Sequence, residues 1–150
     1  MSNNKKLHCT PFIRFLFLTY AVFMIWLLFL QRMENGVILE ENWNFVPFKT
    51  LKLYWRLLFS GNHYYAKQAV VNLAGNVIMF IPLGYFLPAI WLRYGNFWRL
   101  LLISVCIIVI IETTQYFTGL GSCDVDDFLL NLPGIIIGFL IWAIAIKTRI

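Results

Sequence analysis

Four carboxylates lie in the second half of this 150-residue chain, within or directly beside long apolar segments. Glu112 is inside an apolar run that ends in ETTQYFTGLG, and the acidic turn SCDVDD follows it. A carboxylate in an apolar segment is costly to keep, and membrane proteins keep such groups mainly for function. The carboxylates could serve as an acid or a base, receive an amine or a lipid headgroup, or cap a helix.

Composition places these carboxylates in an integral membrane protein. The chain is 61% hydrophobic and only 13% charged, whereas soluble domains carry about 25% charged residues. We expect one all-α membrane domain over residues 1–150. Cys9, Cys106 and Cys123 are too far apart in the predicted topology to suggest a disulfide, and their spacing is not that of a zinc site.

Apolar runs of about 20 residues predict four transmembrane helices, over about 11–30, 70–92, 100–118 and 126–146. Lys49, Lys52 and Arg56 recur at helical spacing between the first two, which predicts a short helix over about 49–59. This helix either lies in the membrane surface or packs on the bundle as an ordinary loop helix. Pro82, with Gly84 and Pro88, is expected to kink the inner half of the second span.

The distribution of basic residues predicts the orientation of the helices. Three short segments on one side carry Lys5, Lys6, Arg93, Arg99, Lys147 and Arg149. Lys and Arg concentrate in short cytoplasmic loops, so we expect both termini in the cytoplasm, the protein in the cell membrane, and the acidic turn outside.

Three helices are expected to bring their polar residues to one depth. Glu112 and Asn131 each lie roughly 10 Å below the outer ends of their helices, at 1.5 Å per residue. Gly134 and Gly138 form a GxxxG pattern that permits close helix approach. We therefore predict an outward-opening polar pocket with two groups of residues. The pocket consists of Glu112, Gln115, Asp127, Asn131, Asn72 and Asn76, with Asp124 and Asp126 at its mouth.

Each of these residues also has a purely structural interpretation. Asp124 stands at a helix start and is interpreted as a cap, and Asp126 is expected to be solvated. The asparagines suit interhelical hydrogen bonds as well as ligand contacts. The acidic turn falls short of the longer calcium-loop pattern, although its carboxylates could collect a divalent cation. No catalytic residue is assigned and no cofactor is expected.

Four stretches, in the same order, resemble the VanZ-like family of bacterial membrane proteins associated with teicoplanin resistance. They are WNFVPF, NVIMFIPLGYFLP, IETTQYF and GSCDVDDFLLNLPGIIIG. The matching positions are Asn76, Phe80, Pro82, Gly84, Glu112, Gln115, Asp124, Asp127, Asn131, Gly134 and Gly138. Two features depart from the family pattern: Gly121-Ser122-Cys123 stands where many relatives have an arginine, and Pro133 replaces a helix former.

The resemblance implies a small helical bundle that lowers glycopeptide susceptibility at the cell envelope. The favoured hypothesis is a non-enzymatic protein whose pocket binds a membrane lipid, or a lipid-linked or peptidoglycan-related ligand, with no role for nucleic acid. One alternative is an enzyme acting on a lipid or lipid carrier with Glu112 or Asp127 as acid or base. A second is a small transporter or flippase subunit, which four helices could form only in an oligomer.

Overall fold

The computed structural model describes residues 11–30, 43–120 and 123–148. It confirms an all-α protein with four helices long and apolar enough to cross a membrane. In chain order the elements are α1 (Pro11–Ile25), the π-helical η1 (Trp26–Leu30), β1 (Trp43–Asn44), α3 (Lys49–Leu58), α4 (His63–Ile90), the 3-10 helix η2 (Leu92–Gly95), α5 (Phe97–Thr118), β2 (Cys123–Asp124) and α6 (Val125–Lys147).

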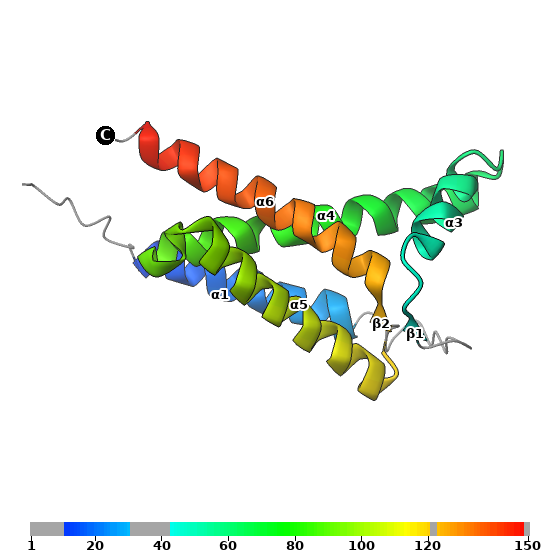
Figure 1. Cartoon of the computed structure of the whole chain (residues 1–150), viewed down its shortest axis with the longest axis horizontal. Helices are drawn as coiled ribbons and strands as arrows, with labels where there is room; N and C mark the ends of the chain where they lie inside the picture. The colour runs from blue at the N-terminus through cyan, green and yellow to red at the C-terminus, as the bar shows by residue number, and fades with distance from the viewer. Residues whose placement is uncertain (1–10, 31–42, 121–122, 149–150) are drawn as a thin grey trace, which may run out of the picture.

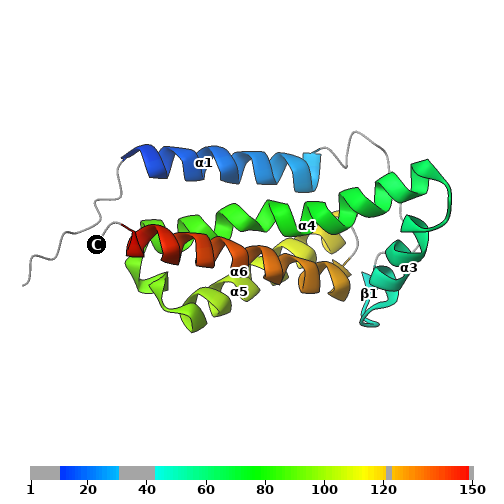
Figure 2. The ribbon, with the colours of Figure 1, turned by 90° about the horizontal axis from the view of Figure 1, so that it is seen from above.

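The four long helices run side by side and alternate in direction (Figures 1 and 2). The Pro11 end of α1 and the Lys147 end of α6 lie at one end of the bundle. The short elements β1, β2 and α3 lie at the opposite end, where α3 runs across the bundle rather than along it. The described part of the acidic turn, residues 123–127, therefore lies at the same end of the bundle as α3.

Helix α4 begins seven residues before the predicted position, at His63 instead of Val70. The side chain of Asn62 caps it by accepting a hydrogen bond from the backbone N–H of Tyr64, at 3.0 Å. The resulting 28-residue helix is roughly 42 Å long, which exceeds a hydrocarbon core of about 30 Å. Its first turns therefore extend past α5 and α6, beside α3 (Figure 1), and the helix continues through Pro82.

Helices α4 and α6 form the most extensive helix contact of the bundle, and glycines make it possible. A Cβ atom at Gly134 would overlap the backbone carbonyl of Val77, and one at Gly138 would overlap that of Ile81. On the facing helix, a Cβ at Gly84 would overlap the carbonyl of Ile135. The predicted GxxxG pattern thus lies in a real backbone-to-backbone contact, in which small residues let two helices approach closely.

The apolar core continues this contact towards α5. Phe80, Ile108 and Ile135, from three different helices, are almost fully buried. Helix α1 packs against α4, where the Tyr20 hydroxyl donates a hydrogen bond to the carbonyl of Met79 at 2.8 Å. The ring of Phe17 packs edge-on against Phe86, with 6.0 Å between the centroids.

We predict that Gly138→Ala destabilises the bundle by about 1–3 kcal/mol, the usual cost of forcing extra volume into a packed site. The added methyl group must displace the Ile81 carbonyl. The measurement is the unfolding free energy of the purified protein in detergent.

Gly75→Ala is the matched control, because Gly75 is in the same helix pair and its Cβ would meet nothing within 4 Å. Alanine is the better helix former by about 1 kcal/mol, so this variant should be at least as stable as the parent. Equal stability losses in both variants would contradict the close α4–α6 contact.

Candidate functional site

The carboxylate of Asp126 forms the centre of the polar network at the α3 end. It is fully buried and accepts three backbone N–H groups, from Phe48 at 2.6 Å, Thr50 at 2.8 Å and Leu51 at 3.1 Å. The first N–H groups of a helix have no partner within it and carry a partial positive charge. Asp126, at the start of α6, therefore caps α3 across the chain. The expectation that Asp126 is solvated was wrong, because α3 brings these amides to it.

Asp124 has two roles in this network. As predicted, it caps α6, accepting the N–H of Asp126 at 2.8 Å. Its carboxylate also accepts the side chains of Asn44, at 3.0 Å, and Thr50, at 2.5 Å. Behind these bonds, β1 and β2 pair in parallel, with Asn44 opposite Asp124. The segment before α3 is thus fastened to the start of α6 by both backbone and side chains.

Phe48 shows how firmly this segment is held. Its φ angle of 65° lies in the left-handed region, which costs a residue with a bulky side chain about 1–2 kcal/mol. This conformation lets the N–H of Phe48 join those of Thr50 and Leu51 on one carboxylate. The hydrogen bonds to buried Asp126 offset the strain.

The other two carboxylates of the predicted pocket accept hydrogen bonds from neighbouring elements. Asp127 accepts the Asn76 amide at 2.6 Å, which ties α6 to α4. Glu112 is 7% exposed and accepts the N–H of Asp124 over a longer distance of 3.4 Å. Glu112 and Asp127 both belong to hydrogen-bonded networks that join helices.

The side-chain amides of the predicted pocket do not converge on one site, because their hydrogen-bond partners lie in different elements. Gln115 is buried and donates to the carbonyl of Leu28 in η1, at 3.1 Å, so it ties α5 to α1. Asn72 donates to the carbonyl of Gln68 in its own helix, at 2.9 Å. Asn131 is 2% exposed, and its side-chain oxygen has no partner among the described residues. The structure thus brings Glu112 to Asp124 and Asn76 to Asp127, while Asn72 stays on its own helix.

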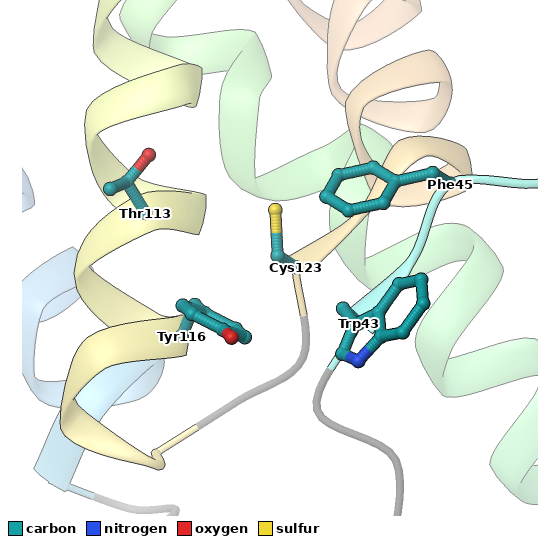
Figure 3. Close-up of a pocket in the computed structure, with 5 residues that line it drawn as sticks. All are labelled: Trp43, Phe45, Thr113, Tyr116 and Cys123. Carbon is teal, nitrogen blue, oxygen red and sulfur yellow. The ribbon is translucent and has the colours of Figure 1, made fainter.

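An open cavity of about 420 Å³ adjoins this network (Figure 3). Trp43 and Phe45 form one wall, and Thr113 and Tyr116 of α5 form the opposite wall. The sulfur of Cys123 points into the space between them. The volume is within the range of small-molecule sites, which are mostly apolar with a few polar groups. Here the hydroxyls of Thr113 and Tyr116 supply the polar groups.

Cys123 is the reactive group at this cavity, and its surroundings suppress its reactivity. Burial raises the pKa of the Cys123 thiol, and the negative charges of Glu112 and Asp124 raise it further. A thiol with a raised pKa has less of the nucleophilic thiolate at neutral pH. Among the described residues, no group of three or more His, Cys, Asp or Glu side chains is placed to hold a metal ion.

Sequence reasoning missed Asn44 and Thr50 as partners of the acidic turn. Asn44 lies in WNFVPF and Thr50 two residues after it, and from the sequence this stretch was used only for the family resemblance. A signal was available, because Asn44 is a polar residue enclosed by aromatic ones in a stretch that the family resemblance had already selected. The cavity walls formed by Trp43 and Phe45 were missed with it.

The fold and the site together define a small multi-pass α-helical membrane protein with a buried carboxylate network at one end. The chain belongs to the VanZ/LLP1 family, whose model matches residues 17–146. No curated protein and no solved structure matches the chain.

We predict that Asp126→Asn releases the N-terminus of α3 while the bundle stays folded. Asparagine offers one acceptor oxygen and an NH₂ group that faces other donors. Each buried N–H left unsatisfied costs about 1–3 kcal/mol. Amide hydrogen exchange of Phe48, Thr50 and Leu51 should therefore accelerate strongly.

Asp127→Asn is the matched control, because the new side chain can still accept the Asn76 amide, whereas the amides of the α3 start donate to Asp126. Exchange at the same three amides should stay slow in this variant. Unchanged exchange in Asp126→Asn would show that the carboxylate does not hold α3.

Proposed function

We propose that this protein acts without catalysis in the bacterial cell membrane and lowers susceptibility to glycopeptide antibiotics of the teicoplanin type. It does so by binding a membrane lipid or a cell-wall-related ligand at the α3 end of the bundle. The family supports the envelope role. The observation that carries the binding role is the cavity between Trp43, Phe45, Thr113 and Tyr116.

The chemistry of the carboxylates supports binding over catalysis. Asp124 and Asp126 accept amides and a hydroxyl, and Asp127 accepts an amide. In the proposal these groups position the cavity walls: Asp124 holds Asn44, which lies between Trp43 and Phe45, and Glu112 supports Asp124. The ligand would meet the aromatic rings and the hydroxyls.

We further propose that the α3 end faces outward and that both termini are cytoplasmic. The support is the density of Lys and Arg in the short segments of the opposite end, which marks the cytoplasmic side. Cys9, which this orientation places in the cytoplasm, lies outside the described residues.

A membrane-impermeant maleimide tests this orientation. A chain that keeps only Cys123 should be labelled in intact cells. Labelling should be slow at neutral pH and accelerate as the pH rises, because the raised pKa of Cys123 leaves little thiolate at neutral pH. Labelling is measured by the mass shift of the purified protein.

A chain that keeps only Cys9 is the control and should be labelled only after the cells are opened. The reverse pattern would exclude the orientation.

Antibiotic susceptibility tests the function itself. Expression of the chain in a glycopeptide-susceptible bacterium should raise the minimal inhibitory concentration of teicoplanin several-fold. Thr113→Trp should abolish the rise, because the larger ring occupies the cavity that Thr113 lines.

Thr114→Trp is the matched control: its exposed position is next along α5 and is not among the described cavity-lining residues. It should keep the rise at equal membrane levels of protein. No rise with the parent chain would remove the resistance role, and equal activity of both tryptophan variants would remove the role of the cavity.

A further inference from the structure

Helix α3 carries a cationic stripe on the side that faces away from the bundle. Lys52 and Arg56 are exposed and lie one helical turn apart. Leu51, Tyr54 and Leu58, on the other side, are partly buried. Residues 43–69 contain two further basic residues, Lys49 and Lys67, and no acidic one. The surface of α3 is therefore positive around Lys52 and Arg56.

Two described carboxylates at this end, Asp124 and Asp126, are bonded to groups other than the stripe. Asp126 is buried on the first amides of α3, and Asp124 binds Asn44 and Thr50. Within the described ranges, neither Lys52 nor Arg56 forms an ion pair. Among the described residues, Asp124 and Asp126 are thus enclosed in the network, while Lys52 and Arg56 lie on the outer surface of α3.

Exposed aromatic residues surround the stripe. Trp55 and Phe59 are 64% and 73% exposed, and their ring centroids lie 5.1 Å apart. Tyr64 and Tyr65 of the adjoining first turn of α4 are also exposed. Tryptophan and tyrosine concentrate at the headgroup level of membranes, where their rings are partly apolar and partly wet.

The length of α4 also places α3 at the depth of the lipid headgroups. Helix α4 has 28 residues, compared with 22 in α5 and 23 in α6. At 1.5 Å per residue it exceeds a hydrocarbon core by roughly 12 Å. The extra turns are those beside α3 (Figure 2), so α3 runs across the bundle at the level of the headgroups rather than in the acyl chains.

We infer that α3 is a binding surface for anionic phospholipid headgroups of the adjacent leaflet. Lys52 and Arg56 supply the charge that phosphate-bearing headgroups complement, and the flanking rings of Trp55 and Phe59 enter the headgroup boundary. Basic residues on a membrane-bound amphipathic helix attract anionic lipids in this way. The surface is separate from the cavity of the proposed function and does not depend on it.

Lipid retention by the full-length purified protein tests this inference. The protein, in detergent, is incubated with equal amounts of phosphatidylglycerol and phosphatidylcholine, and the bound lipids are counted by native mass spectrometry. The parent should retain phosphatidylglycerol in clear excess. Lys52→Gln with Arg56→Gln should reduce that preference by about thirtyfold, the factor that corresponds to an attraction of about 1 kcal/mol for each of two basic residues.

Two control variants define the outcome. Arg99→Gln with Lys147→Gln removes the same charge from exposed positions elsewhere on the long helices and should keep the preference, as should the charge-conserving Lys52→Arg with Arg56→Lys. Equal retention of both lipids by the parent would overturn the inference, as would an unchanged preference in the double glutamine variant. Parent protein that shows no lipid preference but binds soluble heparin would instead assign the stripe to a soluble polyanion.

Discussion

The end of the bundle that carries the site depends on one buried carboxylate. Asp126 accepts three backbone N–H groups of the segment that begins α3. A buried carboxylate is tolerated only when it is well hydrogen-bonded, and the start of a helix supplies both donors and a partial positive charge. Asp126 and α3 therefore stabilise each other, and β1, Phe48 and the cavity wall follow from that bond.

The α4–α6 contact positions this carboxylate. Because Gly134 and Gly138 meet backbone carbonyls of α4, the axis of α6 is fixed closely against its neighbour. The Asn76–Asp127 hydrogen bond joins the two helices again within the first turn of α6. The position of Asp126 thus depends on a helix contact far from the cavity, so a change of helix packing would be felt at the segment before α3.

The sequence was sufficient for the helices and insufficient for the partners of the polar residues. Hydrophobic run lengths located all four spans, and the small residues of α6 predicted a close helix contact, because both signals are local. The capping role of Asp124 was also predicted locally, from a short acid at a helix start. Asp126 was misassigned because its three donors come from residues 75–78 positions earlier in the chain. A single sequence does not reveal such a pairing. The same limit explains Gln115, whose partner is a backbone carbonyl in η1.

The charges of the α3 end are arranged by the cost of burying them. Carboxylates are short and accept backbone amides, so Asp124 and Asp126 can be enclosed where a turn and a helix start converge. Lysine and arginine have long side chains that reach water or headgroups while their apolar stems cover the helix, and Lys52 and Arg56 remain outside. A segment with four basic residues and no acidic one is therefore held by acids from another part of the chain at its N-terminal amides. The side chains of Lys52 and Arg56 point away from this contact, so the hydrogen bonds to Asp126 and the charged surface occupy different parts of one short helix.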